Sequence, residues 1–264
     1  MSSTDSTAPG TRETNSTIGE TTMEATLFGG RLSPFVEKVA RAMQLKGLTF
    51  KLVEPRSPTD FKKWNPQTQK MPVLELDGER YFDSTFIVRK IEEIAPQPSL
   101  FATDSGDAAR QRLLEDWSDE SLYWYLMGCR WAPENAGETV AQLAVTLPPV
   151  FRPIGRILFP RLIGGQARAQ GLARLPLSTL IREIGQHFDE LQVLLGERPF
   201  FFSDTVGVAD LAIYGQLNTM RSGPTPQCEE LISQRRWLVD HFKRVDEATR
   251  PPTKGATARG LKAA

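Results

Sequence analysis

Residues 25–47 read ATLFGGRLSPFVEKVARAMQLKG, which is a short apolar strand, a Gly-Gly turn and an amphipathic helix. Ser33 is a favoured N-cap residue, and Pro34 at the first helical position has its φ already set and gives up no hydrogen bond. Apolar residues then recur every three or four positions with charged residues between them. This spacing predicts one buried and one solvated face. The helix is expected to end at Gly47.

Ser33 has two interpretations. As a plain cap, it only accepts a hydrogen bond from the first turn of the helix. Its hydroxyl would also lie beside free backbone N–H groups, at the positive end of the helix dipole, where a thiolate or another anion is stabilised. The local sequence favours the plain cap, whereas the segment that follows favours the anion site.

Residues 70–84 read KMPVLELDGERYFDS. Alternating apolar residues flank the Asp-Gly pair, which predicts a β-hairpin with a primed turn. Pro72 at the start of the first strand is either an ordinary edge-strand proline or one that a binding site requires. Asp83 is a candidate N-cap of the next helix, and Ser84 with the amides behind it offers a second anion site. Taken alone, an Asp-Ser pair before a helix is usually only a cap.

With these three motifs in this order, residues 25–100 resemble the N-terminal domain of the glutathione S-transferases. The resemblance is greatest to the serine classes, whose first helix begins with Ser-Pro-Phe. The resemblance extends more loosely to residue 248. It implies an α/β thioredoxin-like N-terminal domain followed by an all-α C-terminal domain. It also implies a homodimeric glutathione transferase that joins the thiolate of glutathione, its co-substrate, to a small electrophile without a metal.

The resemblance further implies roles for individual residues. Ser33 would be the catalytic hydroxyl that activates the thiol. Met71, before a cis Pro72, would pair its backbone with the cysteinyl unit, and Lys70 would reach the glycyl carboxylate. The pair Asp83-Ser84 would hold the γ-glutamyl end, although the family usually has the longer Glu before this Ser. The glutathione-binding residues implied in this way are Phe35, Lys70, Met71, Pro72, Asp83 and Ser84.

Composition excludes several other classes of function. Disulfide exchange needs a cysteine of low pKa at the start of the first helix, and residues 30–33 read GRLS, so thioredoxin and glutaredoxin activities are not expected. Cys129 and Cys228 stand in apolar helical surroundings, which predicts buried thiols and a reducing, cytoplasmic location. The 32 basic residues balance the 32 acidic ones, so nucleic acid is not an expected partner. Two histidines without ligand spacing predict no metal site.

The chain is expected to divide into four segments. A Pro-Gln-Pro sequence precedes the point where the pattern becomes wholly helical, which marks a domain boundary. The first residues lack an apolar run and therefore do not form a secretory signal. The expected segments are a disordered tail (1–23), a thioredoxin-like domain (24–102), an all-helical domain (105–248) and a disordered basic tail (249–264).

A helix is predicted over residues 107–131. Trp117, Trp124 and Trp131 are seven residues apart and are expected to share one face, mostly as core. The helix that corresponds to it in the family borders the cleft above glutathione. Residues that would then line an apolar substrate pocket are Trp124, Tyr125 and Arg130.

Residues 146–176 combine prolines, apolar residues and arginines. The segment is too short and too charged to span a bilayer. It is predicted to form a peripheral helix pair whose arginines extend past apolar surface, or a basic apolar element that lies on an anionic membrane surface or covers a cleft, with residues 150–174 as the possible membrane contact.

The rest of the second half is predicted to be helical. A long amphipathic helix starts at Leu177, and His187 beside its apolar face is expected to be structural. Gly207 and Asp210 fit a helix start in which the carboxylate bonds the N-terminal amides, so Asp210 is interpreted as structural. A last helix is predicted over residues 229–247.

Two further functions stay open from the sequence. The same site would serve glutathione-dependent isomerisation or dehalogenation. Alternatively, the chain is a binding module of the metaxin-like kind, which acts at membranes or in assemblies. The presence of Ser33, Pro72 and Ser84 together argues for the enzyme, because a scaffold has no need of all three.

Overall fold

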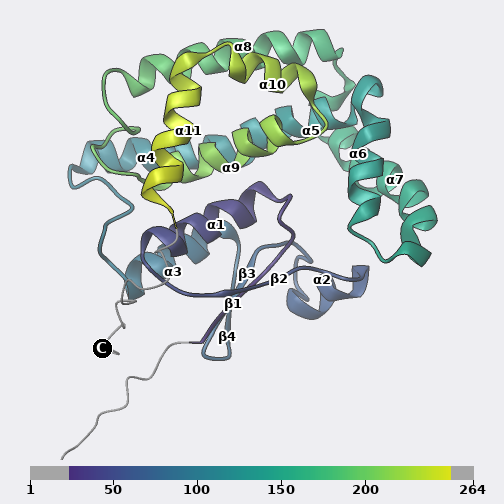
Figure 1. Ribbon diagram of the computed structural model, residues 1–264, viewed down its shortest axis with the longest axis horizontal. Coiled ribbons are helices and arrows are strands. Elements are labelled where there is room, and N and C mark those ends of the chain that lie inside the picture. The colour runs from purple at the N-terminus through teal and green to yellow at the C-terminus, as the bar shows by residue number, and fades with distance from the viewer. Residues whose placement is uncertain (1–23, 251–264) are drawn as a thin grey trace, which may run out of the picture.

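The fold is a thioredoxin-like α/β part followed by an all-α part, as the sequence predicts (Figure 1). The computed structural model describes residues 24–250. The predicted tail 1–23 therefore lies outside the described residues, and so does the predicted basic tail from residue 251 onward. The boundary predicted between residues 102 and 105 falls between the last helix of the first part and the first helix of the second, and it stays a prediction.

The sheet has four strands in the order β2-β1-β3-β4. Strand β1 pairs in parallel with β2 and antiparallel with β3, which forms the predicted hairpin with β4. Asp77 and Gly78 both have positive φ, the backbone of a primed turn. Phe28 pairs with Val73, and Val73 with Phe82, so three strands reach the same edge of the sheet. The strands are β1 (Ala25–Phe28), β2 (Lys51–Val53), β3 (Val73–Leu76) and β4 (Glu79–Phe82).

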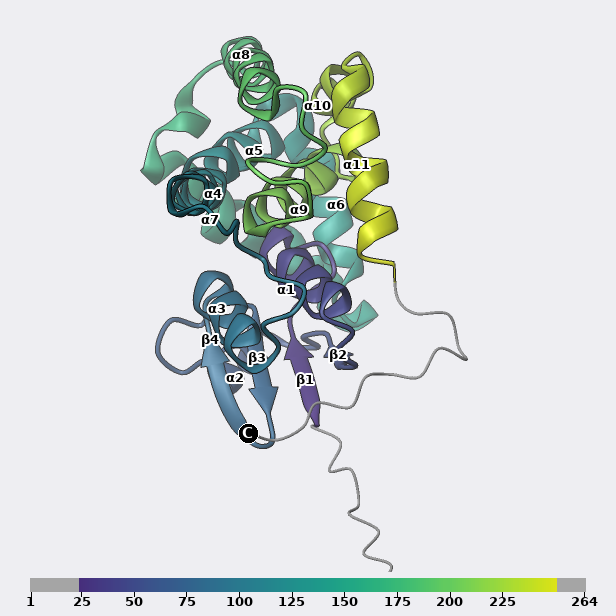
Figure 2. The same cartoon turned by 90° about the vertical axis from the view of Figure 1, so that its left-hand side faces the viewer.

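Three helices accompany the sheet: α1 (Pro34–Leu45), α2 (Pro58–Trp64) and α3 (Ser84–Ile94). Helices α1 and α3 lie between the sheet and the helical part (Figures 1 and 2). Leu27 and Leu74 point to that side and join the main core. Their neighbours Phe28 and Val73 point to the opposite face of the sheet, where Trp64 of α2 covers them.

The second part is built around α9, whose side chains are almost all buried. Helix α9 packs along α1 so closely that a Cβ atom on Gly215 would lie 2.4 Å from the Pro34 carbonyl oxygen. At the start of α9, Asp210 accepts hydrogen bonds from the backbone N–H groups of Gly207 and Phe201, which confirms its structural interpretation. The helices are α4 (Ser105–Trp117), α5 (Tyr123–Trp131), α6 (Pro133–Val145), α7 (Arg152–Gln170), α8 (Leu177–Leu195), α9 (Val208–Ser222), α10 (Pro226–Ser233) and α11 (Arg236–Ala248).

The predicted helix 107–131 is interrupted by a turn of π-helix, η1 (Ser118–Leu122), between α4 and α5. A π-turn takes more residues than an α-turn, so it rotates the following side chains relative to the preceding ones. Trp117 accordingly packs on the main core, whereas Trp124 and Trp131 join a separate cluster with α6 and α7. The prediction that the three tryptophans share one face is therefore wrong.

Two more predictions need correction at the end of the chain. The helix predicted over residues 229–247 is two helices, α10 and α11, with a break at residues 234–235. Thr249, assigned to the basic tail, is buried and hydrogen-bonded to Arg41 of α1. The packed part of the chain therefore extends past α11.

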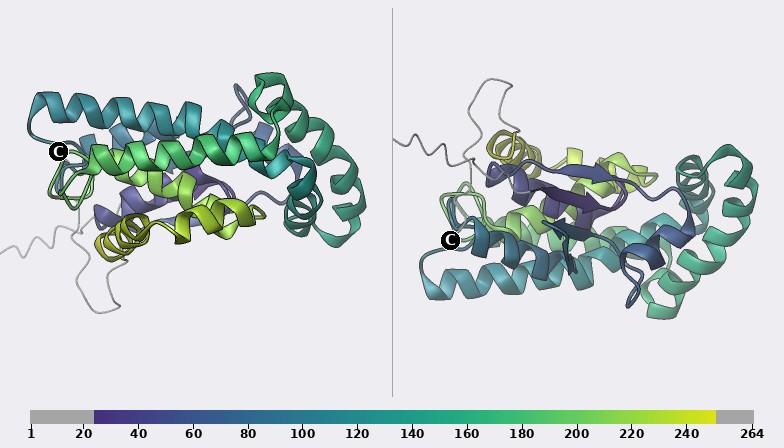
Figure 3. Two further views of the ribbon diagram at one scale, coloured as in Figure 1. Left: turned by 90° about the horizontal axis from the view of Figure 1, so that it is seen from above. Right: turned by 90° about the horizontal axis from the view of Figure 1, so that it is seen from below.

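The segment 146–176 contains α7 between two 3-10 turns, η2 (Pro149–Phe151) and η3 (Leu172–Arg174). Helix α7 continues through Pro160. Helices α6 and α7 lie side by side at one end of the molecule (Figures 1 and 3). Among the helices of residues 24–250, none has both the length and the apolar character needed to cross a membrane.

Candidate active site

The three sequence segments singled out above meet at one edge of the sheet. The ends of β1, β3 and β4 are in register there, which brings the loop before α1, the start of β3 and the start of α3 together. Gly29 allows the loop to pass closely: a Cβ atom on it would lie 2.3 Å from Val36 and 3.5 Å from the Cβ of Met71. A larger residue at this position would separate the loop from its neighbours.

Ser33 is the N-cap of α1. Its Oγ accepts a hydrogen bond from the Val36 backbone N–H at 3.4 Å, a long distance for such a bond. The side chain is half-buried, and its hydroxyl proton is available for donation because the cap uses only an oxygen lone pair. The hydroxyl thus lies at the positive end of the α1 dipole as a possible donor to an anion.

The peptide bond between Met71 and Pro72 is cis, as the resemblance implies. Lys70 before it is exposed, and its ammonium group makes no ion pair within residues 24–250. Asn65, which is almost fully buried, donates through Nδ2 to the Lys70 carbonyl at 3.0 Å and to Thr68 Oγ1 at 2.7 Å. Asn65 therefore fixes this loop, a role that the sequence did not reveal.

The Asp83-Ser84 pair opens α3. Asp83 Oδ1 accepts from the Thr85 backbone N–H at 3.0 Å, as predicted for an N-cap. Its φ of 67° is unusual for a residue other than glycine, and such backbones are concentrated at binding sites. Asp83 is exposed while Ser84 is buried, so the two side chains meet different environments.

A buried charged cluster lies directly behind this pair. Lys38 of α1 is completely buried, and its Nζ lies 2.5 Å from Glu115 Oε1 and 2.6 Å from Asp119 Oδ2. Lys38 Nζ also bonds Thr85 Oγ1 at 3.2 Å, which ties the cluster to the start of α3. The cluster joins the first part of the chain to α4 and η1.

Lys38 is one of the charged residues between the apolar positions of this helix, which the spacing places on the solvated face, and for Lys38 that prediction is wrong. Helix α1 lies between the sheet and the helical part, so both of its faces are covered (Figure 2). A sequence signal did exist. Glu115 and Asp119 are four residues apart and so share one helix face, and Ala42 one turn after Lys38 leaves room for close packing.

Asp119 keeps one free acceptor. Its Oδ1 and the nearby Ser118 Oγ are buried without a hydrogen-bond partner among the described residues. Burial raises the pKa of the Asp119 carboxyl; Lys38 opposes this effect, and the charges of Glu115 and Asp83 add to it. Asp119 is therefore a buried carboxylate, close to Asp83, that a cationic group would stabilise.

Tyr123 is the aromatic residue of α5 that contacts the α1 end of the site. Its ring centroid lies 5.0 Å from that of Phe35 and 5.2 Å from that of Trp124. Burial raises the pKa of the Tyr123 phenol. Tyr123 is not among the pocket residues predicted from the sequence, because the π-turn before α5 changes which residues face α1.

The other two predicted pocket residues lie elsewhere. Residues two apart on a helix point to nearly opposite sides, and Tyr125 accordingly packs against His187 of α8, with ring centroids 5.1 Å apart. Arg130 is buried, and its guanidinium donates to the Thr219 carbonyl near the C-terminal end of α9. That position favours a cation because of the helix dipole.

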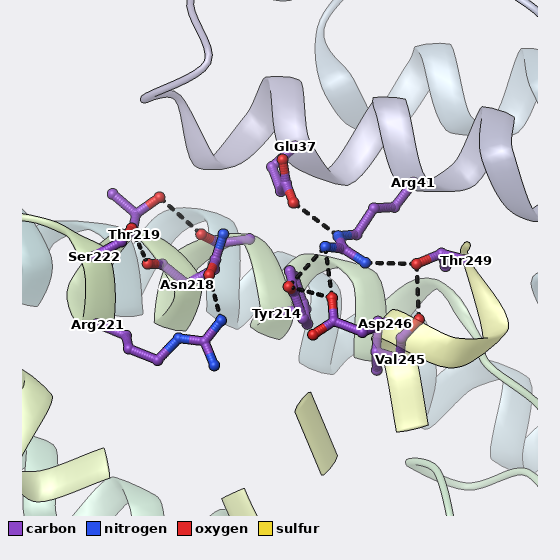
Figure 4. A network of polar contacts seen from close by, with 11 residues as sticks. Glu37, Arg41, Tyr214, Asn218, Thr219, Arg221, Ser222, Val245, Asp246 and Thr249 are labelled. Carbon is purple, nitrogen blue, oxygen red and sulfur yellow. Dashed lines mark hydrogen bonds and ion pairs between the residues drawn. The ribbon is translucent and has the colours of Figure 1, made fainter. Parts of the chain in front are cut away.

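A second polar network anchors α1 on its other side (Figure 4). The Arg41 guanidinium donates to the Tyr214 hydroxyl at 2.6 Å and to Thr249 Oγ1 at 2.5 Å, and it pairs with Asp246 at 2.8 Å. Burial and the bond to Asp246 raise the pKa of Tyr214. The network joins α1 to α9 and α11.

The two cysteines are free and buried, as predicted. A hydrogen bond with Cys228 and burial raise the pKa of the Cys129 thiol. Both thiols are buried, so neither has the exposure of a reactive cysteine.

A thioredoxin-like sheet with a helix-cap serine beside a cis-proline, followed by a helical part, defines a protein of the glutathione-transferase type. Residues 27–99 match the family described as "Glutathione S-transferase, N-terminal domain". The probable glutathione S-transferase BZ2 of Zea mays is 30% identical over 175 residues, which cover 59% of this chain and 72% of that protein. The chain belongs to the glutathione S-transferase family.

Other similarities are shorter or concern the fold alone. Glutathione S-transferase U8 of Arabidopsis thaliana is 30% identical over 112 residues, 40% of this chain and 50% of that one. The chain spans half or less of the length of this and several other curated relatives. The structure of glutathione S-transferase III in its apo form has a TM-score of 0.60 at 18% identity, with 84% of this chain and 91% of that one covered.

Proposed function

We propose that this chain is a glutathione transferase that conjugates the glutathione thiolate to a small electrophile. The observation that carries the proposal is the convergence of the Ser33 cap, the Met71–Pro72 peptide and the Asp83-Ser84 pair at one edge of the sheet. Glutathione is γ-glutamyl-cysteinyl-glycine, with its thiol in the middle and a charged group at each end. An anion-stabilising cap with polar groups on both sides suits such a ligand.

The γ-glutamyl end carries both a carboxylate and an ammonium group. We assign the carboxylate to the Ser84 hydroxyl and the free amides at the start of α3. We assign the ammonium group to Asp83 and to the unpartnered Oδ1 of Asp119. An ammonium group at this position would offset the cost of keeping Asp119 ionised in its buried place. At the other end, the exposed Lys70 would receive the glycyl carboxylate.

The chemistry follows from the middle of the ligand. A hydrogen bond from the Ser33 hydroxyl and the α1 dipole both favour the thiolate, so they lower the pKa of the bound thiol. The thiol proton passes to water, and the sulfur then donates its electron pair to form a bond to the electrophilic carbon, whose leaving group departs with the electron pair of the broken bond, as halide does from an aryl halide. The rings of Phe35 and Tyr123 would form an apolar wall for the electrophile.

Thermal unfolding with and without millimolar glutathione tests binding. Ligand at about ten times its dissociation constant stabilises the native state by about 1.4 kcal/mol, which raises the midpoint by a few degrees. The shift is expected to disappear when Asp83→Ala and Ser84→Ala are combined. Wild-type protein that shows no shift at any reachable concentration would refute the proposal and favour the scaffold.

Conjugation of glutathione to an aryl halide tests the role of Ser33. Ser33→Ala is expected to lower the rate about tenfold or more, or about 1.4 kcal/mol of transition-state stabilisation. The matched control is Ser57→Ala, because Ser57 also precedes a proline at the start of a helix, α2, and its hydroxyl bonds Thr59 and none of the site residues described above. Equal rates for both variants and wild type would reduce Ser33 to a cap.

We also propose a homodimer in a reducing, cytoplasmic compartment. Free buried cysteines support the compartment. Phe86 at the start of α3 and Leu113 on α4 are 62% and 71% exposed, and such large apolar side chains are suited to a subunit contact. Sedimentation velocity of wild type and Phe86→Ser tests this, since a monomeric wild type would exclude the dimer. Isomerisation or dehalogenation at the same site stays an alternative that substrate assays distinguish.

A further inference from the structure

The outward face of α7 and the turn before it carries large apolar side chains. Six of them are between 42% and 72% exposed. On α7 they recur at intervals of three and four residues, so they share one side of the helix. We call this the outer apolar face; it consists of Val150, Phe151, Ile154, Ile157, Leu158 and Leu162.

The opposite side of α7 explains why these residues point outward. The buried residues of α7 are small: Gly155, Gly164 and Ala167. A Cβ atom on Gly164 would lie 2.9 Å from the Trp131 ring of α5, so the helix is already in close contact there. The inner side thus combines small residues in tight packing with the half-buried Phe159 and Ile163, and the other large apolar residues of α7 remain on the outside.

The same part of the chain has a one-sided charge. Between Glu138 and Glu183 the sequence contains six arginines and no Asp, Glu or Lys, although the whole chain has balanced charge. Within residues 24–250, the arginines of this stretch make only one ion pair, that of Arg182 with the adjacent Glu183. Arg156, Arg161 and Arg168 on α7 are exposed and make no ion pair with any described residue.

From these observations we infer that the outer apolar face docks on an anionic phospholipid surface. Apolar side chains on one side of a helix enter the boundary between headgroups and acyl chains, while arginines pair with lipid phosphates and carboxylates. Helices α6 and α7 form one end of the molecule, so a flat surface can reach them (Figures 1 and 3). This inference is independent of the glutathione site.

A second copy of the chain suits this face less well. A two-fold symmetric contact places the same patch against itself, so it would bring the unpaired arginines of both copies together. A bilayer with anionic lipids supplies the missing negative charge and an apolar layer at once. Charge complementarity therefore favours the lipid surface over self-association.

Flotation with lipid vesicles tests the inference. The full chain is expected to float with vesicles of phosphatidylcholine and phosphatidylserine at low salt, and to be released as salt rises. Vesicles of phosphatidylcholine alone should retain much less. Arg161→Gln with Arg168→Gln, two exposed arginines on the side of α7 that carries the outer apolar face, should weaken partitioning about tenfold or more.

Substitutions of exposed apolar residues distinguish the outer apolar face from apolar residues elsewhere on the surface. Ile154→Ser with Leu158→Ser should abolish flotation. The matched control is Val193→Ser with Leu194→Ser, which changes two exposed apolar residues of α8 and should bind like wild type. Circular dichroism verifies that each variant is folded.

Three results would overturn the inference. The first is absence of flotation with anionic vesicles at every ionic strength. The second is equal flotation of the Ile154→Ser, Leu158→Ser variant and wild type. The third is self-association in sedimentation velocity, without lipid, that these substitutions abolish, since the face would then be a subunit contact.

Discussion

Replacing Lys38 with Met is expected to destabilise the protein strongly. Met has a similar length and keeps the packing, but it removes the only cation that bonds Glu115 and Asp119 among the described residues. The side chains of these carboxylates are 3% and 10% exposed, so water replaces little of the lost interaction. Two neighbouring buried carboxylates would then stand without a counter-charge.

The magnitude follows from that burial. Removing one partner of a buried ion pair typically costs about 3–5 kcal/mol. The pKa of Asp119 is already raised in the wild-type protein, and loss of Lys38 removes the group that opposes this. A carboxyl whose pKa is higher in the folded state than in the unfolded state favours folding as pH falls. The loss of stability should therefore be largest near neutral pH and smaller in mild acid.

Urea unfolding near pH 7 and near pH 5 measures both effects, with tryptophan fluorescence and far-UV circular dichroism as independent probes. Lys243→Met is the matched control, because Lys243 pairs with Asp240 on the exposed side of α11 and its loss should leave the midpoint unchanged. A Lys38→Met variant within about 1 kcal/mol of wild type near pH 7 would refute the reasoning. A loss of stability that is as large near pH 5 as near pH 7 would also refute it.

Three more outcomes are expected. Gly215→Ala should lower the free energy of unfolding, measured with urea, by about 1–3 kcal/mol, because the added Cβ would lie 2.4 Å from the Pro34 carbonyl oxygen. The control Gly137→Ala on α6 should not destabilise the protein, because its Cβ would have no atom within 4 Å. Arg41→Met should lower the unfolding midpoint, since it removes the hydrogen bonds to the buried Tyr214 and Thr249 and the ion pair with Asp246. Glutathione affinity, measured by calorimetry, should fall as pH drops through the raised pKa of Asp119, and Asp119→Asn should remove that dependence.

The local features of the first part were predictable because they depend on short-range chemistry. The Ser33 cap, the primed turn of the hairpin and the Asp83 cap each rest on residues within a few positions of one another. The family resemblance implied that these features lie together in one site. The register of strands β1, β3 and β4 gives the physical reason, because it brings their ends to the same edge of the sheet. Asp210 was also predictable, since a carboxylate three residues into a helix bonds the amides at its start.

What the sequence did not reveal depends on contacts between distant segments. Periodicity describes one buried face of a helix, so it cannot show that the second part of the chain covers the other face and encloses Lys38. A π-turn has no simple sequence signature, and it places Tyr123 against α1, while Tyr125, one of the three candidate pocket residues, packs against α8. Both errors arise in the contact between the two parts.

Helix α1 connects these observations. Ser33 caps its first turn, Lys38 one turn further joins it to α4 and η1, and Arg41 joins it to α9 and α11. The cap at the proposed thiol site is therefore held by buried charges contributed by the other part of the chain. Because burying those charges is costly unless all partners are in place, the two parts are expected to fix the position of Ser33 only when they are packed together. On this reasoning, variants in the contact between the parts should impair glutathione binding without touching any residue that contacts the ligand.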